Sequence, residues 1–243
     1  GDGGLATTAK IWANNQSIVV DSNGDIYIAD INNRRIRKVT AATGIITTIV
    51  GTGIAGTTGD GGLAINATLN VPTGIALDSA GNIYILDQAG QVLRKVTVST
   101  GIITTVAGNR SIGSSGDGGS ATSASFNNPS RVTLDSAGNI YISDNGNHKI
   151  RKVTISTGII STIAGNGIAA FTGDNGTAIN ASLNYPSGIK VDSTGCLFIS
   201  DSGNNRIRTV NMSGIITTIA GNGTQTFAGD NGPALSAQLK PYG

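Results

Sequence analysis

Short segments rich in Ile, Val, Thr and Tyr recur along the chain, and each is bounded by Gly, Asn, Asp or Ser. This composition predicts β-strands separated by tight turns. In one copy the first two segments are 73–78 and 83–87, and apolar residues occupy both alternation phases, since Ile75 alternates with Ala76. Strands covered on both faces have this pattern. We therefore expect small sheets, of four strands each, that pack between neighbouring sheets.

The strands belong to a repeat whose period is set by the tetrapeptide Gly-Asp-x-Gly. It begins at Gly1, Gly59, Gly116, Gly173 and Gly229, which gives four units of 56 to 58 residues and the first 15 residues of a fifth. A fixed period in this range indicates stacked supersecondary units. Four-stranded sheets repeated once per unit are the blades of a β-propeller. We predict an all-β propeller in one domain, 1–243, with blades at about 16–50, 73–107, 130–164 and 187–220.

A longer motif within each unit resembles the NHL repeat. It reads Pro-x-Gly-Ile-Ala-x-Asp-Ser-x-Gly-Asn-Ile-Tyr-Ile-x-Asp and continues into Asn-x-Arg-Ile-Arg. The resemblance implies a β-propeller that usually binds or scaffolds other molecules, although a minority of the family are metal-dependent lyases and some animal members bind RNA. The units here are longer than the usual NHL repeat. Four blades leave open a larger ring or array. The motif is clearest at Ile18–Val39, Pro72–Val96, Pro129–Val153 and Pro186–Val210.

The acidic residues argue against catalysis. All 14 are Asp and recur at repeat positions, so none suggests a catalytic pair in which the two pKa values differ. The single His148 and the single Cys196 exclude a transition-metal site built on several His or Cys ligands. His148 is expected to be a solvated loop residue, and Cys196 a neutral turn substitution. We predict that the chain is not an enzyme and holds no catalytic metal or cofactor.

Two classes of Asp are expected to have structural roles. Asp60 and its equivalents in the other linkers are predicted to cap a short helical turn. The Asp that ends the second strand precedes an Arg by seven residues, and a buried guanidinium needs a carboxylate partner. The predicted ion pairs are Asp30 with Arg37, Asp87 with Arg94, Asp144 with Arg151, and Asp201 with Arg208.

A third class of Asp follows the first strand of each unit. A turn-closing role is expected, because Asp can accept hydrogen bonds from its own backbone two residues on. The alternative is that this class lines the propeller axis and binds a hard cation such as calcium through oxygen ligands. These residues are Asp21, Asp78, Asp135 and Asp192.

Charge and composition narrow the class of partner. The net charge is only +2, aromatic residues make up 4%, and the basic residues form no continuous stripe, so nucleic-acid binding is not predicted. No run of 18 apolar residues is present, so membrane insertion is not predicted. Abundant Gly, Thr, Ser and Asn favour a secreted or surface-displayed microbial protein. The start lacks Met and a signal-like segment, which suggests a mature or excised segment.

The copies differ most in the loop between the second and third strands and in the linker before Gly-Asp. Recognition residues concentrate on such loops of rigid scaffolds, and the alternative is drift without function. We predict binding of a protein or glycan, with a propeller lyase or hydrolase carrying an axial metal, or an architectural stretch of a surface array, as alternatives. The surplus fifth linker predicts closure through further blades or a second copy. The predicted contact residues are Arg35, Lys149, Arg206, Phe171 and Phe227.

Overall fold

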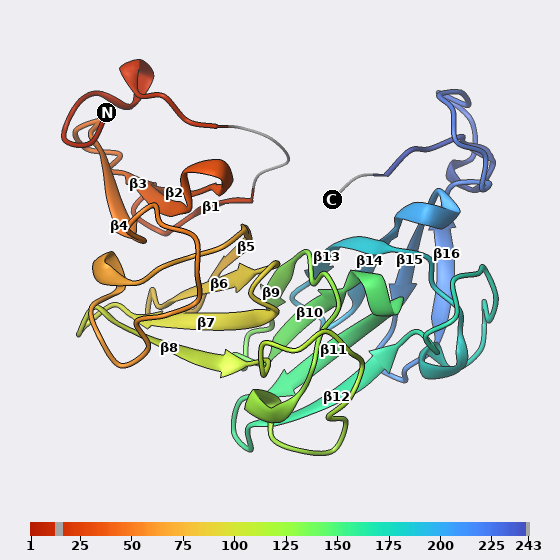
Figure 1. Ribbon diagram of the computed structural model, residues 1–243. Coiled ribbons are helices and arrows are strands. Elements are labelled where there is room, and N and C mark those ends of the chain that lie inside the picture. Colours follow the sequence, from red (N-terminus) through yellow and green to blue (C-terminus); the bar gives the residue numbers. More distant parts are fainter. Residues whose placement is uncertain (13–16, 242–243) are drawn as a thin grey trace. The chain divides into compact units, whose positions relative to one another are not determined.

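The computed structural model describes residues 1–12 and 17–241. It divides into two compact units, Gly1–Ser111 and Ile112–Gly243, and each unit holds two four-stranded antiparallel sheets (Figure 1). The prediction of an all-β chain with four four-stranded blades is confirmed. The strand order within every sheet follows the sequence, as expected when each strand is joined to the next by a short turn.

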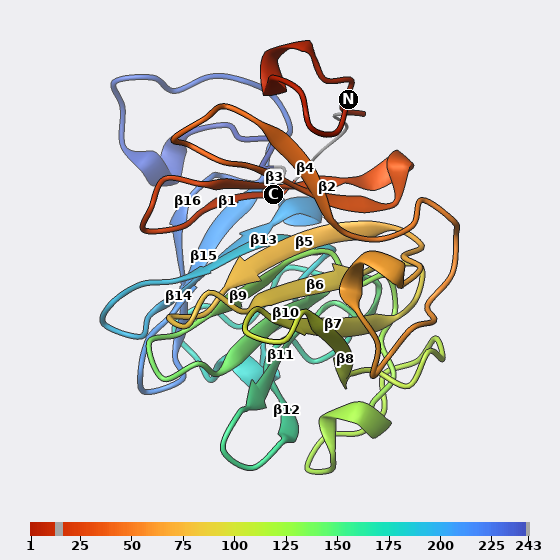
Figure 2. The ribbon, with the colours of Figure 1, turned by 90° about the vertical axis from the view of Figure 1, so that its left-hand side faces the viewer.

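The first unit contains blades 1 and 2, whose strands lie in sequence order across each sheet; Figure 2 shows this order for β5 to β8. Blade 1 consists of β1 (Ile18–Val20), β2 (Ile26–Asp30), β3 (Arg35–Val39) and β4 (Ile46–Val50). Blade 2 consists of β5 (Pro72–Leu77), β6 (Ile83–Asp87), β7 (Val92–Thr97) and β8 (Ile102–Ala107).

The second unit contains blades 3 and 4, with the same internal order. Blade 3 consists of β9 (Val132–Leu134), β10 (Ile140–Asp144), β11 (Lys149–Thr154) and β12 (Ile159–Ala164). Blade 4 consists of β13 (Pro186–Val191), β14 (Leu197–Asp201), β15 (Arg206–Val210) and β16 (Ile216–Ala220).

Helical structure in the described residues is limited to single 3-10 turns. Five of these turns lie in the linkers: η1 (Ala6–Thr8), η3 (Ala64–Asn66), η4 (Ala121–Ser123), η6 (Ala178–Asn180) and η8 (Ala234–Ser236). Three lie between the second and third strands: η2 (Ile31–Asn33), η5 (Asn145–Asn147) and η7 (Ser202–Asn204).

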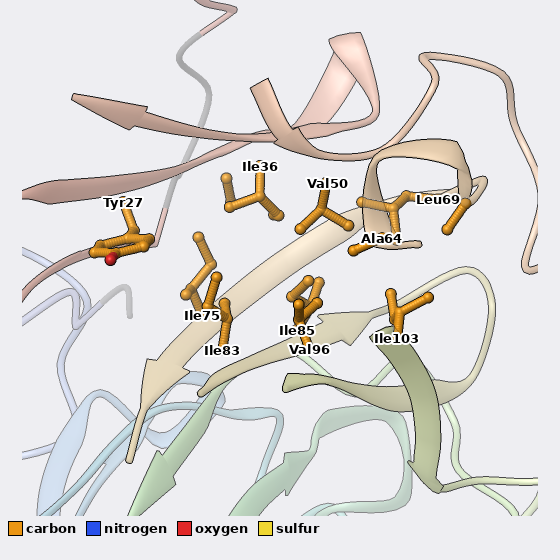
Figure 3. Close-up of a cluster of buried hydrophobic side chains, with 12 residues drawn as sticks. Tyr27, Ile36, Val50, Ala64, Leu69, Ile75, Ile83, Ile85, Val96 and Ile103 are labelled. Carbon is orange, nitrogen blue, oxygen red and sulfur yellow. The ribbon is translucent and has the colours of Figure 1, made fainter. Parts of the chain in front are cut away.

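The core of each unit lies between its two blades. In the first unit, Ile36 and Val50 of blade 1 pack against Ile75 and Ile85 of blade 2 (Figure 3). All five residues of β6 are buried, which explains why apolar residues occupy both alternation phases of that strand. Full burial of each such aliphatic side chain contributes roughly 1.5–3 kcal/mol relative to exposure. Packing between blades is therefore the main source of stability within each unit.

The linker after blade 1 connects the two blades of the first unit. Its backbone pairs with the outer strand β8, because Gly61 donates to the Ile103 carbonyl at 2.8 Å and Ala64 donates to Gly101 at 2.8 Å. The N–H of Gly51, just after β4, donates to the Ala64 carbonyl of the same linker at 3.0 Å. The linker thus lies along the outer edge of one blade while it remains bonded to the end of the other. An outer strand that would otherwise present unpaired backbone groups is covered.

Candidate functional site

A buried Arg on the third strand of each blade organises the linker that precedes that blade. Arg94, Arg151 and Arg208 are fully buried, and Arg37 is nearly so. Each guanidinium contacts the Asp of the Gly-Asp-x-Gly linker at a distance between 2.6 and 2.9 Å. The other carboxylate oxygen of that Asp accepts a hydroxyl hydrogen bond from a Thr of the fourth strand, and in blade 2 the Thr105 hydroxyl donates to Asp60 at 2.7 Å.

The prediction that the linker Asp caps the helical turn is wrong. The N-cap residue of η3 is Leu63, and the turn has no side-chain cap hydrogen bond. Asp60 binds Arg94, 34 residues later, instead. Burial on its own would raise the pKa of Asp60, but the hydrogen bonds from Thr105 and Arg94 and the Arg94 charge outweigh it and lower the pKa.

The predicted pairs between the strand-end Asp and the same Arg are present as longer contacts in three blades. The distances are 3.3 Å for Asp30 with Arg37, 3.3 Å for Asp144 with Arg151, and 3.6 Å for Asp201 with Arg208. The fourth prediction is wrong, since within the described residues Asp87 and Arg94 form no ion pair.

Asp87 instead holds the chain entering β5. Its carboxylate accepts the N–H groups of Asn70 and Val71 at 2.9 and 2.8 Å. Burial raises the pKa of Asp87 despite these hydrogen bonds. Burial likewise raises the pKa values of Asp144 and Asp201. These carboxylates are buried and already accept hydrogen bonds from neighbouring residues, so their role is structural.

Two of the predicted contact residues, Arg206 and Phe171, lie together. The Arg206 guanidinium is 3.7 Å from the centre of the Phe171 ring, a stacked cation–π arrangement. It also donates hydrogen bonds of 2.9 Å to the backbone carbonyls of Asn204 and Asn222. The pair therefore joins the loop between β14 and β15 to the linkers on either side of blade 4.

A second aromatic pair lies at the same end of the strands, between blades 3 and 4. The rings of His148 and Tyr185 meet edge to face with centroids 4.6 Å apart, and the Tyr185 N–H donates to His148 Nδ1 at 3.1 Å. Tyr185 remains 53% exposed. Burial lowers the pKa of His148, which favours the neutral ring that this hydrogen bond requires. The expectation that His148 is simply solvated is wrong.

We call Phe171, Arg206, His148 and Tyr185 the loop surface of the second unit. The sequence prediction missed two members, since it did not name Tyr185 and it expected His148 to be a solvated loop residue. For Tyr185, the available signal was its position immediately before Pro186, where the other blades have Val71 and Asn128. Its left-handed backbone, with φ of 47°, turns the chain into β13 and leaves much of the ring exposed.

The remaining predicted contact residues are placed differently. Lys149 donates from Nζ to the Ser114 hydroxyl at 2.9 Å, which ties the loop after β10 to the preceding linker. Arg35 lies in the first unit, where it donates to the Thr52 carbonyl at 2.7 Å. Phe227 is 84% exposed on the last linker. The structure therefore places Arg206 with Phe171 but leaves Arg35 in a separate unit.

The first-turn Asp residues close their own hairpins. Asp78 accepts the N–H groups of Ala80 and Asn82 at 3.0 and 2.9 Å, and the Tyr84 hydroxyl donates to it at 3.4 Å. Asp21, Asp135 and Asp192 accept bonds from their turns in the same way. Across residues 1–12 and 17–241, no three His, Cys or Asp side chains lie close enough together to hold a metal ion.

Antiparallel four-stranded sheets that are repeated once per unit and pack through apolar faces define the β-propeller class. Two family models match this chain: the Teneurin NHL domain at residues 53–115 and 169–235, together just over half of the 243 residues, and the NHL repeat at residues 126–153. The chain belongs to the NHL-repeat family.

The curated relatives are much longer than this chain. Teneurin-3 of Mus musculus is 31% identical over 223 residues, which are 82% of this chain and 8% of that protein. NHL repeat-containing protein 2 of Bos taurus is 28% identical over 232 residues, which are 83% of this chain and 32% of that protein. The chain therefore spans less than a third of either relative.

Solved structures share the fold. An auxiliary nutrient binding protein from Bacteroides ovatus aligns with a TM-score of 0.66 and 16% identity, over 97% of this chain and 54% of that one. A chain of a nidogen/laminin complex aligns with a TM-score of 0.60 and 20% identity, over 85% and 64%. A streptogramin B lyase aligns with a TM-score of 0.54 and 20% identity, over 83% and 52%. Among the described residues, no helix is long and apolar enough to span a membrane.

Proposed function

We propose that this chain is a non-enzymatic binding module that acts outside the cell and recognises a protein through the loop surface of its second unit. The observation that carries the proposal is that the exposed Tyr185 and the stacked pair of Arg206 and Phe171 lie at the same end of the strands in the second unit. Tyr and Arg are enriched among the residues that dominate protein–protein affinity, and groups already fixed in place lose little entropy on binding. His148 fixes Tyr185, and backbone carbonyls fix Arg206.

The absence of an enzyme role is part of the same proposal. Each first-turn carboxylate is occupied by donors of its own turn, and each strand-end carboxylate is buried. A general acid or base must reach a substrate proton within hydrogen-bond distance. The lyase with a similar fold is too dissimilar in sequence for its activity to be transferred.

Two solved structures with a similar fold support the proposed location outside the cell. The fold is similar to a bacterial auxiliary nutrient binding protein and to a chain in a nidogen/laminin complex. The composition, with abundant Gly, Thr, Ser and Asn, agrees with a secreted or surface-displayed chain.

The test is capture of binding proteins from a secreted and cell-surface fraction, with matched variants. Wild type and Arg110→Ala, a substitution of an exposed Arg in the first unit, are expected to retain the same protein. Tyr185→Ala and Arg206→Ala are expected to lose it. Retention by all four forms would contradict a loop-surface site. A parallel glycan array tests for a carbohydrate ligand. If no protein is captured, and wild type binds a glycan that Tyr185→Ala does not bind, the ligand is a carbohydrate and the protein proposal is wrong.

An architectural role is the second candidate. The linker after blade 4 is folded like the other linkers, although no further blade follows it among the described residues. The linker after β16 has the same turn as the others, and Gly221 and Asn222 donate to Ala234 and Ala237 at 3.0 and 2.9 Å. A chain extended by one further repeat unit tests this candidate. If the linkers join units into an array, the extended chain should have a larger free energy of unfolding, because it gains one more interface between blades. No increase would contradict the array.

A further inference from the structure

A cavity of about 630 Å³ opens between blades 3 and 4, at the opposite end of the strands from the loop surface. One wall is formed by Tyr141 of β10 and Lys152 of β11, and the other by Leu197 of β14 and Val210 of β15. Ile179 of η6 contributes to the lining. Small-molecule sites are concave, have volumes of about 300–1,000 Å³, and combine an apolar lining with a few polar groups. The cavity has the size and the composition of such a site.

Two charged groups line the cavity, the Asp135 carboxylate and the Lys152 ammonium. The carboxylate already accepts several hydrogen bonds, so the ammonium is the group that can bind a ligand. The Asp135 carboxylate accepts hydrogen bonds from the Ala137 and Asn139 backbone at 3.0 and 2.8 Å, from the Asn139 amide at 2.9 Å, and from the Tyr141 hydroxyl at 3.1 Å. The Lys152 ammonium lies 5.2 Å from the centre of the Tyr141 ring. An ammonium has three donors, so it can bind a ligand oxygen in addition to these neighbours.

The environment of Lys152 differs from that of its counterpart in blade 1. There, Lys38 forms an ion pair with Asp25 at 2.7 Å. In blade 3 the position of Asp25 is taken by Asn139, whose amide is bound to Asp135. Within the described residues, Lys152 has no carboxylate at ion-pair distance. The Lys152 charge helps to lower the pKa of Asp135, but the two groups form no ion pair, so a ligand carboxylate would supply the direct partner that Lys38 has in blade 1.

The wall contributed by blade 4 is also specific to this copy. In blades 2 and 3, Asn82 and Asn139 accept the backbone N–H of Val98 and Ile155 at 3.0 and 3.1 Å, which ties the first turn to the last turn of the blade. Blade 4 has Cys196 at this position, and its last turn is one residue shorter.

The residue on that shorter turn extends the apolar lining. Met212 lies in the cavity wall, is 75% exposed and packs against Gly195. An exposed thioether at the mouth of a cavity is a flexible apolar contact that adapts to the shape of a ligand. These two differences of blade 4, Cys196 and the shorter last turn, therefore lie next to residues that line the cavity.

We propose that this inter-blade cavity binds a small amphiphile that has an apolar body and a carboxylate. The carboxylate accepts hydrogen bonds from the Lys152 ammonium, and the body lies against Leu197, Val210, Ile179 and Met212. A charge-assisted hydrogen bond orients the ligand, and burial of the body supplies most of the affinity. The site is separate from the loop surface, so it can operate whether or not that surface binds a protein.

The experiment is calorimetric titration of the full chain with octanoate, and with octylammonium as a probe that has the same body and the opposite charge. Octanoate is expected to bind and octylammonium to bind at least about tenfold more weakly, as the loss of one charge-assisted hydrogen bond predicts. Equal affinity for the two probes, or no octanoate binding, would overturn the proposal.

Variants place the site. Lys152→Met is expected to weaken octanoate binding about tenfold, whereas Lys95→Met, at the equivalent position over the Tyr84 ring in blade 2, should leave it unchanged. Met212→Trp should weaken binding by filling the cavity, with the melting temperature as a check on folding. Tyr185→Ala should have no effect, which separates this site from the proposed function. Equal effects of Lys152→Met and Lys95→Met would contradict the assignment.

Discussion

The Arg206 guanidinium stacks on the Phe171 ring at 3.7 Å, and this one contact links two segments that are 35 residues apart in the sequence. Phe171 also lies 5.1 Å from the guanidinium of buried Arg208, so one ring contacts two Arg side chains of β15. Replacement of Phe171 by Leu keeps an apolar side chain but removes the π face.

We expect Phe171→Leu to lower the free energy of unfolding by about 1 kcal/mol, the magnitude of a partly exposed cation–π contact. Chemical denaturation measures this change. Phe227→Leu is the matched control, because Phe227 is 84% exposed and a change there should be close to neutral. The same loss in both variants would indicate that the Arg206 stack contributes nothing.

Arg94→Ala should be strongly destabilising. The fully buried guanidinium donates to Asp60 at 2.7 Å and to the carbonyls of Thr68 and Thr58 at 2.9 and 3.1 Å. Removal of one partner of a buried pair costs about 3–5 kcal/mol, because the other groups lose their partner. Thermal unfolding against Arg110→Ala, a more exposed partner of the same Asp60, checks the prediction. Equal melting temperatures would show that the guanidinium is dispensable.

The strands and turns could be predicted from the sequence because their determinants are local. Asp78 and Gly81 lie within four residues of each other and close one hairpin, and Gly81 has a φ of 79° that glycine adopts without strain. The apolar residues on both alternation phases of β6 likewise lie next to one another in the sequence, and they correctly indicated a strand that is buried on both faces.

The link between Asp60 and Arg94 could not be predicted in this way. It depends on the linker lying along β8 of the blade that follows, a placement set by backbone pairing between Gly61 and Ile103. Seven-residue spacing favoured Asp87 as the partner, but that side chain is turned toward the N–H groups of Asn70 and Val71. The sequence prediction assigned the strand-end Asp to each Arg and the linker Asp to a helical cap, so it missed the pairing between the linker and the third strand.

Acid should act on the first unit partly through Asp60. The folded-state pKa of Asp60 is lowered, so its contribution is fully present above the unfolded pKa of about 3.9 and is lost as pH falls through the folded pKa. We expect Asp60→Asn to lose less stability than wild type when the pH is lowered from 5 to 2.5. Asp230→Asn is the control, because Asp230 is an exposed linker residue. Parallel stability curves for wild type and Asp60→Asn would contradict this role.

His148 is a base and Asp60 an acid, but both should make the protein less stable as the pH falls. Its folded-state pKa is lowered by burial, so the neutral ring is stabilised by folding and stability falls as pH drops from the unfolded value of about 6.5 toward the folded pKa. Protonation at Nδ1 also removes the acceptor for the Tyr185 N–H. The Tyr185 amide resonance, followed by NMR between pH 7.5 and 4.5, should titrate with a midpoint below 6.5. His148→Asn should abolish that titration, and a midpoint at or above 6.5 would exclude the buried ring.

Blades 3 and 4 differ at the repeat position of Asn139 in the first turn. Asn139 donates to Asp135 and accepts the Ile155 N–H, and Cys196 occupies the same repeat position without an amide. We expect Asn139→Cys to lower the free energy of unfolding by about 1–2 kcal/mol, since one hydrogen bond within the first turn and one between the first and last turns are lost.

The reciprocal substitution Cys196→Asn tests whether the shorter last turn of blade 4 still permits the bond. If an amide at position 196 can reach the Met212 N–H, the variant should be about 1 kcal/mol more stable than wild type, because one hydrogen bond is gained. It should also bind octanoate more weakly, because joining the two turns narrows the mouth of the cavity between blades 3 and 4. Denaturation and calorimetry measure the two effects separately. A variant with unchanged stability and unchanged octanoate affinity would mean that the turn length, and not the loss of the amide, determines the shape of this wall.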